Sequence, residues 1–228
     1  MGIDLLREGD VFVLRWDGDQ NRLNDESVSA WNAALDEVEA ADGPAALVTT
    51  GAGKFYCNGL DLDQLGLSSE AKAGEEGFRE LVPAVLRLMG RLLVFPRPTV
   101  AALNGHAFAA GGMLALAQDF RVMRRDRGWF CIPEIDLNMW LAPGMVALLK
   151  ARLPTLTFHE SIVTGRRYTG PESVEHGIVQ QVVADDDVVP TAVDIAGLLT
   201  DKDPTTLQAL KRGMYGDVVD LLESGRLT

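Results

Sequence analysis

The chain has 228 residues, enough for one large domain or two small ones with a sizeable buried core. Its composition, 47% hydrophobic and 24% charged, is typical of a globular protein, without low-complexity tracts, internal repeats or an apolar run that could span a bilayer. A formal net charge of -12 argues against binding to nucleic acid or to an anionic membrane surface. Two cysteines, Cys57 and Cys131, lack the spacing of a zinc site or a disulfide framework, so we expect both to be reduced. The first ten residues carry acids where a signal peptide needs a basic start, which favours a cytoplasmic location.

A sheet is predicted to begin at the N-terminus. Residues 3–6 and 11–16 form the predicted strands of a hairpin, because the Val-rich and aromatic second stretch follows a Glu-Gly-Asp turn. Residues 23–43 then predict an amphipathic helix that Asn24 or Asp25 caps and Gly43 ends. Its apolar residues fall at helical spacing: Val28, Trp31, Leu35 and Val38.

Two short apolar runs, at 45–51 and 99–105, are typical of strands buried on both faces. A loop and an apolar helix near residues 76–94 separate them. Strands that alternate with helices imply parallel crossovers, so the pattern predicts an α/β layered fold.

Beyond residue 105 the pattern predicts a short helix, strands at 120–123 and 128–135, and a mainly helical C-terminal region. Four helices are expected there, around residues 144–153, 156–164, 187–200 and 204–223. No linker rich in Pro, Gly or Ser divides the chain, so we expect one core with this helical region packed on it or on a neighbouring subunit.

The stretch NGHAFAAGG (104–112) indicates a close approach to the backbone at the start of a helix. Its glycine spacing does not match the dinucleotide fingerprint, and neither it nor GAGKFY (51–56) has the Gly-Lys-Ser/Thr ending of a P-loop. No Gly-x-Ser-x-Gly elbow occurs, and the three histidines lack metal-ligand spacing. Small residues at 109–112 could let an oxyanion reach backbone N–H groups, or could simply pack a helix on a strand. A second turn of this kind at Gly59 favours a ligand, since two donors could converge from neighbouring strand ends.

These two turns, together with PTVAALNGHAFAAGGMLALAQDFRVM (98–123), IPEIDLNM (132–139) and TGRRYTGPESVEHGIVQQVV (164–183), resemble the enoyl-CoA hydratase/isomerase, or crotonase, family. The resemblance covers residues 3 to about 185. It implies a crotonase-like core of repeated ββα units over residues 1–185 and a short helical region over 186–228. It also implies an acyl-CoA substrate and a homotrimer or dimer of trimers.

The resemblance assigns the oxyanion hole to the backbone N–H groups of Leu60 and Ala110. Family hydratases use two glutamates; here the first position is Met113 and the second is Glu134. A thioether cannot ionise or orient water, whereas one carboxylate suffices to move a proton, so the pattern resembles the single-glutamate Δ3,Δ2-enoyl-CoA isomerases. Lys54 and Phe55 match the family's CoA-binding loop.

Glu134 is expected to carry a proton from C2 to C4 of a 3-enoyl-CoA through a dienolate, without a metal or redox cofactor. The acyl pocket that would raise its pKa is assigned to apolar residues: Phe108, Met113, Met139, Trp140 and Leu141.

Two other functions remain open from the sequence. A hydratase, or another crotonase-fold reaction, would need a second acid or base from Asp61, Asp136 or His106. A homologue that binds acyl-CoA without catalysis would keep the turns and lose the chemistry. Asn138, where many relatives have glycine, also bears on the shape of the acyl pocket.

Overall fold

A hairpin opens the main sheet, as predicted. In the computed structural model, which describes residues 2–63 and 75–227, β1 (Gly2–Glu8) pairs antiparallel with β2 (Val11–Asp17). Gly9 takes a φ of +62° in the connecting turn, a conformation that glycine adopts without steric strain.

The main sheet has six strands in the order β1-β2-β3-β5-β7-β9, and every pair from β2 onward is parallel. The remaining strands are β3 (Ala46–Gly51), β5 (Thr99–Leu103), β7 (Phe120–Arg124) and β9 (Gln181–Val183). β3 and β5 are buried along their whole length, which confirms the interpretation of the two apolar runs. The three-residue strand β9 was not predicted, because so short a segment carries no periodicity of its own.

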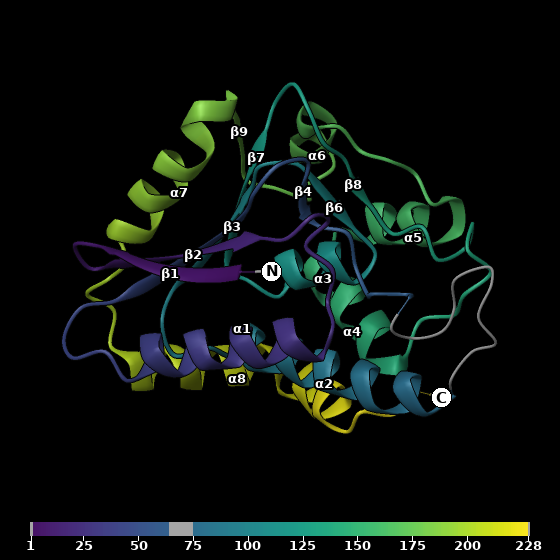
Figure 1. The fold of residues 1–228 in the computed structure, drawn as a ribbon, viewed down its shortest axis with the longest axis horizontal. Helices are drawn as coiled ribbons and strands as arrows, with labels where there is room; N and C mark the ends of the chain where they lie inside the picture. Colours follow the sequence, from purple (N-terminus) through teal and green to yellow (C-terminus); the bar gives the residue numbers. More distant parts are fainter. Residues whose placement is uncertain (1, 64–74, 228) are drawn as a thin grey trace.

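Helices cover both faces of this sheet (Figure 1). On one face, α1 (Asp25–Glu39) and α2 (Glu75–Leu93) contribute to the larger hydrophobic core. On the other face, α7 (Val188–Gly197) buries Val188, Ala192 and Ala196 against residues of β2, β3, β5 and β7. The predicted Asn24 cap is confirmed: its side chain accepts a hydrogen bond from Ser27 N–H, and Ser27 Oγ accepts one from Asn24 N–H.

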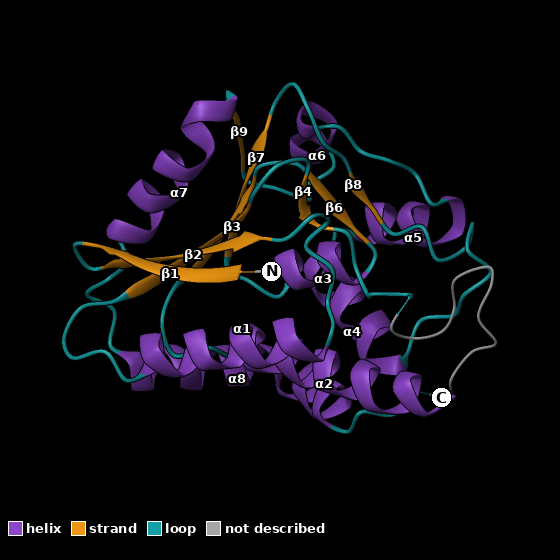
Figure 2. Cartoon of the chain, in the orientation of Figure 1, coloured by secondary structure: helices purple, strands orange, loops and turns teal. Residues whose placement is uncertain are grey.

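A second, smaller sheet holds the segments that matter most for function (Figure 2). It consists of three parallel strands in the order β4-β6-β8: β4 (Phe55–Cys57), β6 (His106–Phe108) and β8 (Phe130–Cys131). Each follows one strand of the main sheet along the chain, namely β3, β5 and β7, and precedes a helix, namely α2, α3 (Ala110–Leu116) and α4 (Pro143–Arg152). The chain therefore contains three successive ββα units, the layered α/β architecture that the resemblance implied.

Two expectations are corrected by this small sheet. The strand predicted at 128–135 is the two-residue β8, followed by a turn. The two small-residue turns follow β4 and β6, not the longer strands β3 and β5 from which we expected them to emerge. Strands of two or three residues are too short for a recognisable alternation of apolar and polar residues, and their pairing depends on tertiary contacts.

Glycines allow these layers to approach closely. A Cβ added to Gly111 would collide with the backbone carbonyl of Cys57, and one added to Gly105 would collide with that of Lys54. The first contact seats α3 directly on β4, so the small residues of 104–112 serve backbone packing as well as any ligand.

The C-terminal region packs on the core of the same chain. The four predicted helices correspond to α4, α5 (Thr155–Thr164), α7 and α8 (Pro204–Glu223), and the short α6 (Gly170–Glu175) and a 3-10 turn at Asp185–Asp187 were not predicted. Lys211 anchors α8: its buried ammonium donates to Phe95 O at 2.9 Å and to the Asp119 carboxylate at 2.7 Å. Within residues 2–63 and 75–227, no helix has both the length and the hydropathy needed to cross a membrane.

We expect Gly111→Ala to destabilise the protein by roughly 1–3 kcal/mol, because the added methyl group meets a backbone carbonyl that cannot rotate away. Thermal unfolding of the purified variant measures this. Gly213→Ala is the matched control: it lies on α8 with nothing within 4 Å of an added Cβ, so higher helix propensity should leave stability equal or slightly raised. Equal melting temperatures for the two variants would contradict the close-packing interpretation.

Candidate active site

The carboxyl ends of the three small-sheet strands bring the predicted catalytic groups together. Leu60 comes three residues after the end of β4, Ala110 two residues after β6, and Glu134 three residues after β8. The first two turns are in contact: a Cβ built on Gly59 would lie 3.0 Å from Ala109 Cβ and 3.5 Å from the Ala110 nitrogen. All three residues line one cavity.

Neither predicted oxyanion donor uses its N–H group in a hydrogen bond to another described residue. Leu23 N–H donates to Gly59 O at 2.8 Å, and Asp61 N–H donates to Leu23 O at 2.9 Å. Leu60 lies between Gly59 and Asp61 in the chain, and its own N–H donates to no described residue. Ala110 is the first residue of α3, where N–H groups have no partner within the helix, and it too donates to no described residue. Ala109, with φ 51° and ψ -126°, holds a conformation that favours glycine, and its N–H donates to Cys131 O at 2.9 Å.

Glu134 is held by a compact turn that continues from β8. Its carbonyl accepts hydrogen bonds from Leu137 N–H at 3.2 Å and Met139 N–H at 3.0 Å. Asn138 has a φ of 54° in this turn, the left-handed conformation that suits glycine and that asparagine tolerates. Asn138 therefore supports the same backbone path that a glycine would.

The carboxyl group of Glu134 is in an apolar environment. Its Oε2 is buried and has no hydrogen-bond partner within the described part of the chain. Burial favours the neutral form and raises the pKa of Glu134 to about 7. A carboxyl group with this pKa can both accept and return a proton near neutral pH.

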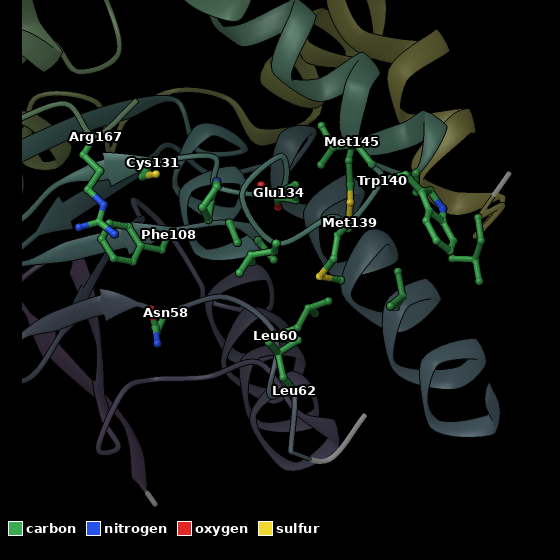
Figure 3. Close-up of a pocket in the computed structure, with 18 residues that line it drawn as sticks. Asn58, Leu60, Leu62, Phe108, Cys131, Glu134, Met139, Trp140, Met145 and Arg167 are labelled. Carbon is green, nitrogen blue, oxygen red and sulfur yellow. The ribbon is translucent and has the colours of Figure 1, made fainter. Parts of the chain in front are cut away.

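The cavity has a volume of about 310 Å³ and two chemically different ends (Figure 3). Arg167, Phe108 and Asn58 lie at one end, Trp140 lies toward the other, and Glu134 lies between them. Among the described residues that line the cavity, Glu134 is the one with an acidic side chain and Arg167 is the one with a basic side chain. The other lining residues are mainly apolar. The full lining is Asn58, Leu60, Leu62, Val82, Phe108, Ala109, Ala110, Cys131, Pro133, Glu134, Leu137, Met139, Trp140, Leu141, Ala142, Met145, Arg167 and Leu227.

Four of the five residues predicted for the acyl pocket line this cavity: Phe108, Met139, Trp140 and Leu141. The fifth, Met113, does not. It is fully buried in the large hydrophobic core, because α3 is enclosed by other elements along its whole length.

The two residues predicted to bind CoA lie beside the cavity and not in its wall. Lys54 lines a neighbouring cleft at the carboxyl end of the main sheet, together with Arg15 and Arg127. The Phe55 ring packs on His106 with 5.2 Å between centroids.

Arg167 and Trp129 were not identified from the sequence, although Phe108, which lies beside both, was predicted for the acyl pocket. The Arg167 guanidinium lies over the rings of Phe108, at 5.8 Å, and Trp129, at 5.4 Å. His106 packs on both rings with 5.0 Å between centroids. Arg167 falls within the 164–183 stretch that carries the family resemblance, but a single arginine among surface charges gave no reason to choose it.

The three rival acids and bases lie outside the cavity lining. Asp61 pairs with Arg22 at 3.4 Å. Asp136 is exposed, and its carboxylate approaches Gly165. His106 accepts a hydrogen bond at Nδ1 from Trp129 N–H, and burial together with nearby Arg127, Arg167 and Lys54 lowers its pKa. In the described part of the chain, no group of three or more His, Cys, Asp or Glu residues is arranged to hold a metal ion.

A sequence model of the enoyl-CoA hydratase/isomerase family matches residues 11–226, almost the whole chain. The chain belongs to this family. Crotonase-family relatives with established names include enoyl-CoA delta isomerase 2, peroxisomal, of Arabidopsis thaliana, 29% identical over 96% of this chain and 94% of that protein. Another is carnitinyl-CoA dehydratase of Proteus mirabilis, 34% identical over 72% of this chain and 60% of that protein.

Solved crotonase structures share the fold over nearly the full length. The apo enoyl-CoA isomerase of Mycobacterium tuberculosis superposes with a TM-score of 0.88 at 24% identity, covering 98% of this chain and 95% of that one. An enoyl-CoA hydratase/isomerase family protein from Pseudomonas syringae gives a TM-score of 0.88 at 23% identity over 98% and 94% of the two chains. At these identities the likeness establishes the fold alone.

The buried carboxyl group of this crotonase should make the protein less stable as the pH rises. An unfolded Glu134 loses its proton near pH 4.5 and the folded one near pH 7, so between these values the folded state binds more protons and its stability falls with pH. We expect Glu134→Gln to remove this dependence and to exceed the wild type by roughly 1–3 kcal/mol at pH 8, with little difference at pH 4.5. Urea unfolding at both pH values measures the difference. A variant no more stable than the wild type at pH 8 would contradict the raised pKa.

Proposed function

We propose that this crotonase is a Δ3,Δ2-enoyl-CoA isomerase that moves a double bond with a single glutamate. The observation that supports this most is the content of the cavity. Glu134 lines it together with Leu60 and Ala110, whose N–H groups donate to no described residue, and none of the other acids considered for catalysis lines it. Moving a proton between two carbons requires one group that can accept it and return it.

The reaction begins with the thioester carbonyl oxygen accepting hydrogen bonds from Leu60 N–H and Ala110 N–H. The Glu134 carboxylate removes a proton from C2, and the electrons of the broken C–H bond delocalise into the thioester as a dienolate whose negative oxygen these donors stabilise. The carboxylic acid then gives the proton to C4. The C3–C4 double bond becomes a single bond, a C2–C3 double bond forms, and Glu134 is again a carboxylate.

Hydration is the second candidate, and the site favours it less. Adding water needs groups that orient the water and move its proton at a second position. Met113 has no such group and is buried away from the cavity, and Asp61, Asp136 and His106 lie outside its lining. The names of the Arabidopsis relatives, enoyl-CoA delta isomerases 2 and 3, support isomerisation. A homologue that binds acyl-CoA without catalysis would have no use for a carboxyl group kept at a raised pKa.

The CoA part of the substrate is proposed to lie at the Arg167 end of the cavity, near Lys54 and Phe55. Arg167 and Lys54 both lie close enough to His106 to lower its pKa, so this side of the cavity carries positive charge that can attract the phosphates of CoA in a chain of net charge -12. The homotrimer or dimer of trimers and the cytoplasmic location remain predictions. Two of the Arabidopsis relatives, enoyl-CoA delta isomerases 1 and 2, are named as peroxisomal.

The decisive assay supplies 3-hexenoyl-CoA and 2-butenoyl-CoA separately to the purified protein. We expect conversion of the first to 2-hexenoyl-CoA and no hydration of the second.

Glu134→Gln should lower kcat for isomerisation by about 10²–10⁴-fold, because the amide cannot accept the C2 proton, while acyl-CoA binding persists. Asp136→Asn, two residues away and outside the lining, is the matched control and should retain activity. Hydration of 2-butenoyl-CoA would favour the second candidate, and an inactive wild type that binds the esters would favour a binding protein.

The pH dependence of isomerisation should report Glu134. Because the carboxylate is the active form, kcat/KM for 3-hexenoyl-CoA is expected to rise with pH and level off, with a midpoint near 7. Steady-state rates from pH 5 to 9 provide the profile. A rate that is already level from pH 5 upward would contradict the raised pKa of Glu134.

Arg167→Leu should weaken substrate binding more than it slows the chemical step, because the guanidinium lies at the end of the cavity away from the proton transfer. We expect KM to rise roughly 5- to 50-fold, with kcat changed less than threefold, and the salt dependence of KM to shrink. Arg125→Leu, an exposed arginine outside the cavity, is the control. A drop in kcat alone would contradict a binding role.

A further inference from the structure

Three elements that are far apart in the sequence contribute apolar residues to the wall of the cavity. Val82 of α2, Met145 of α4 and Leu227, which follows α8, all line it. Val82 and Met145 are almost fully buried, and Leu227 packs against the large hydrophobic core. None of the three was identified from the sequence.

Each of these residues lies next to a close contact between helices. Pro83, beside Val82, would be 2.9 Å from a Cβ added to Gly225, two residues before Leu227. Gly144, beside Met145, packs on Leu222: its added Cβ would lie 3.0 Å from Leu222 Cδ2. The contacts that join α2, α4 and α8 therefore also fix the wall of the cavity.

The position of α8 is fixed independently of the cavity. The Lys211 ammonium donates hydrogen bonds to Phe95 O and to the Asp119 carboxylate, on the chain segments that lie between α2 and β7. Gly225 has a φ of +62°, which turns the chain immediately after α8 and leads it back to the cavity. Val82 and Met145 are carried by these packed helices, and Leu227 follows the end of α8 by four residues, so we expect the wall to move little when a ligand presses against it.

We infer that Leu227, with Val82 and Met145, stops the acyl chain and limits the protein to short- and medium-chain acyl-CoA esters. The inference rests on the proposed function only in taking an acyl-CoA ester as the ligand. The apolar wall suits the methyl end of an acyl chain, whereas Arg167 at the opposite end suits the phosphates of CoA. A cavity of about 310 Å³ is near the lower limit for ligand sites, which leaves little room for a long chain.

A second hollow provides the competing route for a longer chain. It has a volume of about 380 Å³ and shares Glu134, Met139, Trp140 and Leu141 with the first cavity. Its far side is lined by Phe158 and Val163 of α5. A chain that entered it would bypass Leu227.

The test measures affinity for saturated acyl-CoA esters, from butanoyl-CoA to hexadecanoyl-CoA, by isothermal titration calorimetry. Saturated esters cannot isomerise, so binding is read without turnover. For the wild type we expect affinity to rise about fourfold for each added methylene until the chain meets the wall, and then to stop rising at twelve carbons or fewer. In Leu227→Ala the affinity should keep rising for at least two more carbons of acyl chain, and in Leu227→Trp it should stop rising at a shorter chain than in the wild type.

Two controls separate chain-length selection from a general loss of structure. Leu210→Ala removes an exposed leucine of α8 that does not line the cavity, and should leave the length profile unchanged. Val163 is an exposed residue that lines the second hollow, and Val163→Trp fills this hollow. If the acyl chain ends at Leu227, this variant should also leave the length profile unchanged.

The inference is overturned if the wild-type affinity keeps rising through hexadecanoyl-CoA, if Leu227→Ala changes all lengths by the same factor, or if Val163→Trp shortens the profile. It is also overturned if no ester binds more tightly than CoA alone. Failure of the proposed function has a different signature: the length profile would be as expected, while 3-hexenoyl-CoA would bind and remain unchanged.

Discussion

The contact between the turns after β4 and β6 is the constraint on which the candidate site depends. Gly59 has no side chain, and its backbone approaches Ala109 and Ala110 so closely that a Cβ would already be in tight contact. The contact brings two N–H groups to one cavity, and the Ala109 N–H bond to Cys131 O ties them to β8, which leads to Glu134. Three neighbouring strand ends thus carry the groups proposed to bind the anion and to transfer the proton.

This arrangement explains why the small sheet is so short. Strands of two or three residues supply few hydrogen bonds of their own and are held by the layers around them. All three strands end at the same edge of the small sheet, so the turns that follow them can approach the same cavity. The strained φ of Ala109 and the left-handed Asn138 both occur in these turns, where surrounding contacts enforce the conformation.

The environment of Glu134 connects the fold with the proposed chemistry. The same burial that raises its pKa to about 7 makes the folded state less stable at high pH, so a group useful for proton transfer carries a cost in stability. The cavity wall shows a similar connection. Close contacts among α2, α4 and α8 stabilise the helices and at the same time place Val82, Met145 and Leu227 against the space where an acyl chain would end.

The sequence by itself determined the long elements and the identity of the central groups. Helical periodicity predicted α1 and α2. A Val-rich and aromatic stretch after a turn predicted the first hairpin, and continuous apolar runs predicted the buried strands β3 and β5, because each of these elements carries its own hydrophobic pattern. The turn residues Gly59, Ala109 and Ala110 and the Pro133-Glu134 pair pointed to the site through their chemistry and family resemblance. Only the tertiary structure decided the small sheet, the exclusion of Met113 from the cavity, and the positions of Arg167 and Leu227. These features depend on contacts between residues far apart in the chain, and short segments or single side chains carry no local signal of them.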